Sequence, residues 1–167
     1  LFIETDGTVE SSETEAARIE EIAVAHGATD VKIAREKKEV KGLWQARRSI
    51  SQSLRKVKPN KLNEDIVVPR SKMVELIEGV RGISEARDLT IASFGHAGDG
   101  NIHVNVMIDK SDAREASEGL KAVEDVFSLA LSLGGTISGE HGVGTAKAPY
   151  LDMELSKDTI AAMKRIK

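Results

Sequence analysis

The segment 90–107, TIASFGHAGDGNIHVNVM, restricts the possible fold more than any other part of this chain. Asp-Gly is a preferred centre for two-residue type I′ hairpin turns, and here Asp99–Gly100 separates two stretches that read as strands. We therefore predict an antiparallel hairpin. In that register His96 lies directly opposite His103, with Cβ atoms about 4.5–5.5 Å apart.

The alternation of side chains in this hairpin predicts one polar face and one apolar face. Asn105 follows His103 by two residues and therefore shares its face. The opposite face carries Ile102, Val104 and Val106. Two imidazoles on one face could share a single cation. A solvated hairpin with two partly exposed histidines fits the same pattern, so both interpretations stay open.

Strands and amphipathic helices alternate along the rest of the chain. The helical spacing of apolar residues is supported by a capping box at Ser12 and Glu15 and by caps at Asp112 and Glu115. We expect helices over residues 12–26, 37–57, 71–87, 112–133 and from 156 onwards, and strands at 1–5, 30–34, 65–68, 90–96, 101–107 and from 136. This pattern predicts an α+β fold with a largely antiparallel sheet and helices on one face, in a single domain of residues 1–167.

The composition excludes several classes of function. The 167 residues carry a net charge of −3, which gives no basis for binding nucleic acid. The chain has no cysteine, so disulfides, thiolate zinc sites and cysteine nucleophiles are excluded. No apolar run approaches the roughly 20 residues of a membrane span, and no signal peptide is visible. We expect a cytoplasmic protein.

The second stretch that could carry chemistry is SGEHGVG, residues 138–144, in which glycines surround Glu140 and His141. Glycine permits backbone conformations that let neighbouring side chains converge or a ligand approach the main chain. Two imidazoles and one carboxylate would leave positions open on a divalent metal, and His141 would stay available for acid–base work. A surface loop with a charged pair is the alternative. The stretch matches neither the phosphate-loop pattern nor the dinucleotide fingerprint.

Arg47 is unusual because it occupies an inward position of the expected 37–57 helix, between Leu43 and Ile50. Burying an unpaired guanidinium is costly, so it needs an anionic partner or a path to solvent. A structural ion pair, a side chain that reaches outward, and a clamp for a substrate carboxylate all satisfy that requirement.

Four segments together resemble the C-terminal, substrate-side domain of the FAD-linked 2-hydroxy-acid dehydrogenases, a family that includes D-lactate dehydrogenases, the glycolate oxidase large subunit and D-2-hydroxyglutarate dehydrogenase. They are FGHAGDGNIHVNV, SGEHGVGTAK, LWQARRS and KLNEDIVVPRSK, and the resemblance as a whole spans roughly residues 40–167. The resemblance implies a ferredoxin-like α+β domain that covers a flavin held by a separate N-terminal domain. The 167 residues would then be a fragment that lacks the flavin-binding part.

The resemblance also implies roles for individual residues. His96, His103 and Glu140 would bind a divalent metal, Zn or Mn, and His141 would be the base that removes the substrate hydroxyl proton. Contacts to the substrate would come from Arg47, Ser51 and Asn105. A lysine that some members use for a distal carboxylate is replaced by Asn63, with Lys61 nearby, which argues against a dicarboxylate substrate.

The implied reaction is the flavin-dependent oxidation of a D-2-hydroxy acid, of the lactate or glycolate type, to the 2-oxo acid. The expected partners are the small substrate, the N-terminal FAD domain and electron-acceptor subunits, and the protein could associate with a membrane electron-transfer complex. Two rival functions remain. One is a stand-alone metal hydrolase that uses the same two histidines and glutamate, and the other is a non-catalytic module in which a metal only stabilises the hairpin.

Overall fold

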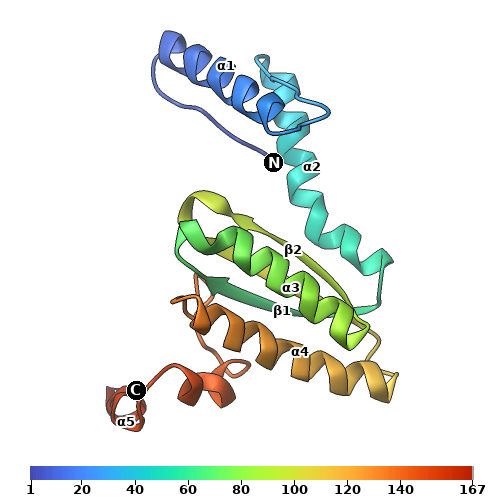
Figure 1. Cartoon of the computed structure of the whole chain (residues 1–167), viewed down its shortest axis with the longest axis vertical. Helices are drawn as coiled ribbons and strands as arrows, with labels where there is room; N and C mark the ends of the chain where they lie inside the picture. Colours follow the sequence, from blue (N-terminus) through green and yellow to red (C-terminus); the bar gives the residue numbers. More distant parts are fainter. Residues whose placement is uncertain (167) are drawn as a thin grey trace. The chain divides into compact units, whose positions relative to one another are not determined.

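The computed structural model describes residues 1–166, which form two compact units that divide after residue 53 (Figure 1). The first unit contains α1 (Val9–Ala25) and α2 (Lys37–Ser53). Helix α1 begins before the expected capping box, because the Thr8 hydroxyl already accepts a hydrogen bond from the Ser11 N–H at 3.2 Å. Residues 1–5 and 30–34, all within the described part, are not in strands, so both strand predictions are wrong.

Helix α2 carries the apolar stripe expected from its sequence. Val40, Leu43 and Ile50 are half-buried while most of the helix is exposed, and Arg47 lies in the same stripe. The helix ends at Ser53 rather than at residue 57, and the turn η1 (Leu54–Lys56) follows as the first element of the second unit.

The second unit is built on a three-stranded antiparallel sheet in the order β1-β3-β2. Its strands are β1 (Asn60–Val67), β2 (Thr90–His96) and β3 (Asn101–Ile108), and its helices are η2 (Arg70–Lys72), α3 (Met73–Arg87), η3 (Ala97–Asp99), α4 (Ala113–Ser132), η4 (Ala148–Met153) and α5 (Lys157–Ile166). The expected strand from residue 136 is reduced to an antiparallel bridge between Thr136 and Val67, on the free edge of β1. With that bridge the order of segments is that of a ferredoxin-like fold, and the α+β prediction is confirmed.

The core lies between one face of this sheet and helices α3 and α4 (Figure 1). All eight residues of β3, the central strand of the sheet, are buried. From α4, Phe127 and Val126 pack into the core with zero exposure. The core-facing residues of β3 are Ile102, Val104, Val106 and Ile108, so the predicted apolar face is confirmed.

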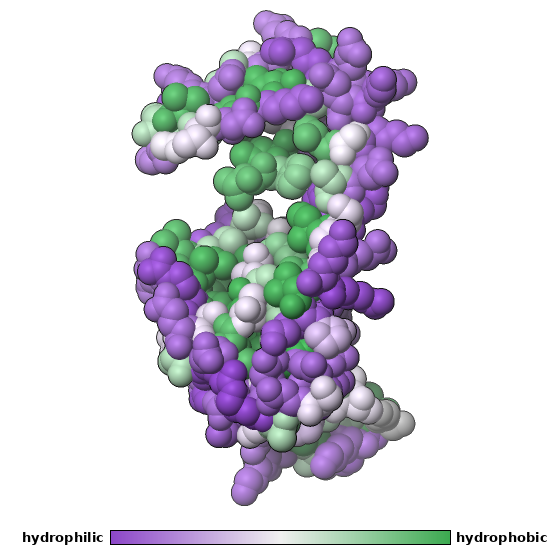
Figure 2. All heavy atoms as spheres, turned by 90° about the vertical axis from the view of Figure 1, so that its right-hand side faces the viewer, coloured by the Kyte–Doolittle hydropathy of each residue, from purple (hydrophilic) through white to green (hydrophobic). Residues whose placement is uncertain are grey.

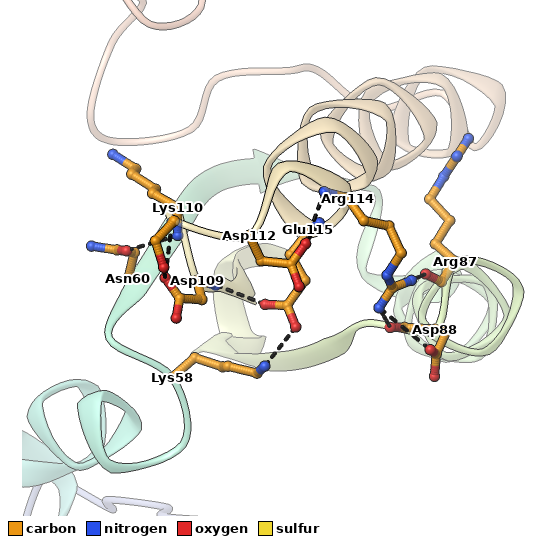
Figure 3. A network of polar contacts seen from close by, with 10 residues as sticks. Lys58, Asn60, Arg87, Asp88, Asp109, Lys110, Asp112, Arg114 and Glu115 are labelled. Atoms are coloured by element: carbon orange, nitrogen blue, oxygen red, sulfur yellow. Dashed lines mark hydrogen bonds and ion pairs between the residues drawn. The ribbon is translucent and has the colours of Figure 1, made fainter.

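The N-terminus of α4 is fixed by side chains, as the Asp112 and Glu115 pattern predicted. Asp112 accepts hydrogen bonds from the N–H groups of Arg114 at 2.8 Å and Glu115 at 3.1 Å. Glu115 in turn accepts from Lys58 at 2.6 Å and from the Asp109 N–H at 2.7 Å (Figure 3). These bonds join the start of α4 to the segments that precede β1 and follow β3.

Polar and charged side chains dominate the surface in Figure 2, with hydrophobic residues exposed among them in both units. None of the helices in residues 1–166 combines the length and the apolar composition that crossing a bilayer requires.

The hairpin between β2 and β3 forms, but in a different register from the expected one. His96 is opposite Asn101, and His103 is opposite Phe94, so the prediction of directly facing histidines is wrong. The connection contains the 3₁₀ turn η3 and ends at Gly100 with φ +73°. A Cβ at Gly100 would clash with the Val68 carbonyl oxygen, so this glycine allows a close approach to the segment after β1 as well as a turn.

Candidate functional site

Three histidines gather at the polar face of the sheet, with His103 at their centre. Its ring lies 5.7 Å from that of His96, which ends β2, and 5.2 Å from that of His141, in the loop after Thr136. The register differs from the expected one by two residues. Because a shift of two keeps each side chain on its face, His96 and His103 still meet, now as diagonal neighbours.

His96, His103 and Glu140 form a set suited to a metal ion. A ligand atom from each lies within 4.8 Å of the others, and His96 Nε2 is 3.6 Å from Glu140 Oε1. The His103 side chain is 10% exposed, whereas those of His96 and Glu140 are 40% and 52% exposed. The set is therefore anchored in the protein at His103 and open on the side of His96 and Glu140.

Two features of His103 fit a metal ligand whose second ring nitrogen, Nδ1, faces the protein interior. Its Nδ1 is buried and has no hydrogen-bond partner among the described residues, which is unusual for a buried polar atom. Burial lowers the pKa of this imidazole, and the nearby His141 and His96 act in the same direction against the attraction of Asp65 and Glu140. A neutral imidazole is the form that binds metals. The alternative interpretation, a merely solvated pair of histidines, does not fit this buried ring.

Asp65 is a site residue that the sequence analysis missed. It is fully buried on β1, where it is paired with His103 of β3. Its Oδ1 accepts from the Asn101 amide at 2.5 Å, and its Oδ2 accepts from the N–H groups of Gly139 at 3.1 Å and His141 at 2.8 Å. The carboxylate therefore ties the loop that carries Glu140 and His141 to the sheet.

The charge of Asp65 is stabilised by these neighbours. Burial by itself raises the pKa of the Asp65 carboxyl, but the hydrogen bonds from His141 and Asn101 and the charge of Lys147 outweigh it, so the pKa lies below its usual value. Lys147 is 4% exposed, and its Nζ donates to the Asp65 backbone carbonyl at 2.6 Å. Burial lowers the pKa of Lys147, against the pull of Asp65 and Glu64.

Gly139 in the GEHG stretch has a packing reason to be glycine. A Cβ at this position would clash with Asn101 Nδ2 and would lie 2.6 Å from Asp65 Oδ1, and both of these residues are buried. The absence of a side chain thus lets the loop backbone reach the carboxylate that holds it.

We expect Gly139→Ala to destabilise the protein by about 1–3 kcal/mol, because overpacking a closed site forces its neighbours apart. The melting temperature should fall measurably. Gly98→Ala is the matched control, since a Cβ at Gly98 would meet nothing within 4 Å. Equal melting temperatures for the two variants would contradict the packing explanation.

His141, the expected base, has a fixed backbone and a half-exposed imidazole. Its ring stacks on that of His103 at an interplanar angle of 11°, and its Nδ1 lies 3.9 Å from Asp65 Oδ2. Its side chain is 52% exposed. The ring is thus placed beside the candidate metal set while one side stays open, although Asp65, His103 and His141 also form a second set within 4.8 Å.

Asn105, an expected substrate contact, is fully buried on the same face. Its amide donates to the carbonyls of Ala92 at 3.1 Å and His103 at 3.2 Å, and its Oδ1 accepts from Lys61 Nζ at 3.0 Å. The pKa of Lys61 is lowered by burial and by the neighbouring charge of Arg55. Like Asp65, Lys61 lies on this face of the sheet and was not predicted as a site residue.

Arg47 and Ser51, the other expected substrate contacts, lie on α2 in the first unit. Arg47 is half-buried, and no hydrogen bond or ion pair joins its side chain to another residue within 1–166. A structural ion pair with a described residue is therefore not what accounts for its inward position. The roles of both residues stay predictions.

Comparison with known proteins places this site in context. Residues 1–167 match the family model described as FAD linked oxidases, C-terminal domain. Over the whole chain, the sequence is 41% identical to the glycolate oxidase subunit GlcD of Bacillus subtilis, covering 36% of that protein. It is 29% identical to the GlcD subunit of Escherichia coli K12 and 34% identical to the mitochondrial D-lactate dehydrogenase [cytochrome] of Arabidopsis thaliana, covering 34% and 30% of them. The chain thus spans about a third of the length of these relatives.

Proposed function

We propose, because this chain belongs to the C-terminal domain family of the FAD-linked oxidases, that it is the substrate- and metal-binding part of a flavin-dependent dehydrogenase. The whole protein would oxidise a D-2-hydroxy acid of the lactate or glycolate type to the 2-oxo acid. The observation that carries this proposal is the convergence of His96, His103 and Glu140 around an open position, with His103 anchored in the sheet. The names of the relatives, a glycolate oxidase subunit and a D-lactate dehydrogenase, support the substrate class.

The donor set fits a divalent metal such as Zn²⁺ or Mn²⁺, since imidazole and carboxylate are common ligands of both ions. When bound, that ion would supply Lewis-acid polarisation of the substrate hydroxyl, and FAD on the N-terminal domain would supply the hydride acceptor. Two imidazoles and one carboxylate form the three-ligand arrangement that leaves room for a substrate.

The remaining residues would bind the substrate and move its proton. His141 would take the hydroxyl proton, and its half-exposed imidazole beside the candidate set supports this role. Arg47 would hold the carboxylate with its two-pronged guanidinium, which matches that geometry. Ser51 and Asn105 would complete the substrate contacts, with Asn105 already held on the site face of β3.

This division of labour distinguishes the proposal from the two rivals. A stand-alone hydrolase would need the same metal and base but no flavin, and membership of a FAD-linked family argues against it. A module that uses a metal only for packing would not require a half-exposed histidine, nor an arginine that makes no ion pair with any residue in 1–166.

We expect the whole protein to bind close to one divalent metal ion per chain, and to lose it when any of the three ligands is changed. His96→Ala, His103→Ala and Glu140→Ala should each reduce the metal content strongly, because three protein ligands leave no redundancy. Elemental analysis of purified, flavin-loaded protein measures this. His26→Ala is the matched control, since His26 is exposed at the end of α1. Equal metal content in the wild type and all three ligand variants would refute the site.

A further inference from the structure

Asp65 connects the sheet, which carries His103, to the loop that carries Glu140 and His141. It is not among the expected metal ligands. Both ends of the loop 139–147 are attached to this one residue. Gly139 and His141 donate to its carboxylate at the start of the loop, and Lys147 donates to its backbone carbonyl at the end. The Gly139 nitrogen also lies 3.2 Å from that same carbonyl oxygen.

The carboxylate also faces the anchoring histidine. Asp65 Oδ1 is 3.7 Å from His103 Nδ1, the buried nitrogen that has no hydrogen-bond partner among residues 1–166. A histidine that binds a metal through one nitrogen almost always directs the N–H of the other towards a carboxylate, a carbonyl or water, which fixes the tautomer and the ring orientation. Since Nδ1 lies 3.7 Å from this carboxylate, Nε2 of His103 is left for the ligand role.

We infer that Asp65 is the positioning residue of this site: its carboxylate orients His103 for metal binding through Nε2 and clamps the loop that presents Glu140 and His141. The inference rests on the proposed metal site and adds to it a residue that determines how well the site is formed.

Asp65 is better suited to positioning than to direct ligation. Its Oδ2 already accepts two backbone N–H groups, and its Oδ1 accepts the Asn101 amide. Ligation by Asp65 in the second candidate set, with His103 and His141, would draw charge from the carboxylate oxygens and weaken the bonds that hold the loop. A buried carboxylate that loses such donors becomes costly, so the observed network favours the indirect role.

Glu64 offers a matched control on the same strand. Glu64 is 8% exposed, and its charge raises the pKa of Lys147, as that of Asp65 does. It is paired with Val104 of β3, so its side chain lies on the other face of the sheet from that of Asp65. Its Oε2 has no hydrogen-bond partner among the described residues. Glu64→Gln therefore removes a buried carboxylate near Lys147 without touching the bonds to Gly139 and His141.

The test compares Asp65→Asn with Glu64→Gln in the whole flavin-loaded protein, stripped of metal and titrated with Co²⁺. In Asp65→Asn the new NH₂ group meets a donor in either orientation, because Asn101 donates to one carboxylate oxygen and Gly139 and His141 donate to the other. Co²⁺ affinity, measured by competition with a chelator, should fall about 10–100-fold in Asp65→Asn. The visible absorption of bound Co²⁺ should also change in Asp65→Asn, because the ring of His103 is no longer oriented. Glu64→Gln should match the wild type in both measurements.

A purely structural role for Asp65 predicts a different result. In that case Asp65→Asn would lower the melting temperature but leave the affinity and spectrum of bound Co²⁺ unchanged, which would overturn the inference. If Asp65→Asn does not fold, Asn101→Ala keeps the carboxylate but removes the amide that fixes its Oδ1. Weaker Co²⁺ binding by Asn101→Ala would then support the inference, and unchanged binding would overturn it.

Failure of the metal site itself is distinguishable from failure of this inference. If the wild type binds no Co²⁺, the proposed function loses its metal and the orientation of His103 for a metal is refuted with it. The clamp is then judged by hydrogen exchange at the Gly139 and His141 amides. Faster exchange in Asp65→Asn than in Glu64→Gln supports the clamp, whereas equal exchange in the two variants overturns it.

Discussion

Replacing His141 by alanine in the whole protein should lower kcat for D-2-hydroxy acid oxidation by about 10²–10⁴-fold, the usual contribution of a general base. The reason is that His96 and His103 are assigned to the metal set, which leaves His141 as the imidazole of this cluster that can take the proton. Metal content should remain close to that of the wild type, because His141 lies outside the three-ligand set. Steady-state kinetics and elemental analysis on the same preparations measure both quantities.

The fourth histidine provides the comparison for this experiment. His26 is exposed at the C-terminal end of α1, so His26→Ala should keep wild-type kcat and wild-type metal content. Loss of metal from His141→Ala would assign His141 to the second candidate set, with Asp65 and His103, instead of to proton transfer. Near-normal turnover would remove it from the chemistry altogether.

Local sequence patterns were sufficient to identify which residues share a face of the sheet. Alternation along β3 correctly separated His103 and Asn105 from Ile102 and Val104. The exact partners across the hairpin were wrong, because the type I′ preference of Asp-Gly treats a turn as an isolated unit. Here Gly100 is held against Val68 of the neighbouring segment, and the Val68 N–H donates to the Gly100 carbonyl at 3.0 Å. A tertiary contact thus selected the longer connection.

The missed part of the candidate site depends on pairing between distant segments. Asp65 stands at the start of the apolar run DIVV, which predicted a strand, and a carboxylate in an apolar strand is a weak sign that it needs partners. Those partners are distant in the sequence: Asn101 is 36 positions away, Gly139 is 74 and His141 is 76. No local periodicity predicts that β1 pairs with β3, so only the fold identifies the carboxylate that faces His103.

The incorrect strands in the first unit have a simpler physical cause. The short apolar segments at residues 1–5 and 30–34 resemble strands in composition, but a strand is stabilised by pairing along its edge. In the first unit neither segment, nor any other residue described there, lies in a strand. Propensity alone is a weak predictor where no sheet is available.

Changing Arg47 to lysine should lower kcat/KM for the hydroxy acid about 10-fold or more, and alanine should lower it further. A bidentate guanidinium–carboxylate pair is made of two charge-assisted hydrogen bonds, worth about 1.5–3 kcal/mol each, and lysine keeps the charge without the fork. Arg47 is suited to this role because it lies half-buried in the apolar stripe of α2 and makes no ion pair with another described residue.

Arg48 is the matched control for this prediction. It follows Arg47 on the same helix but is exposed, so Arg48→Lys should leave kcat/KM unchanged. A carboxylate clamp also predicts that Arg47→Ala discriminates poorly between the hydroxy acid and its uncharged amide, since the lost charge is the one that binds the carboxylate. If Arg47→Lys instead keeps wild-type kinetics and only lowers the melting temperature, the side chain stabilises α2 through its packed stem, and the substrate carboxylate must be bound by another cation such as Lys61.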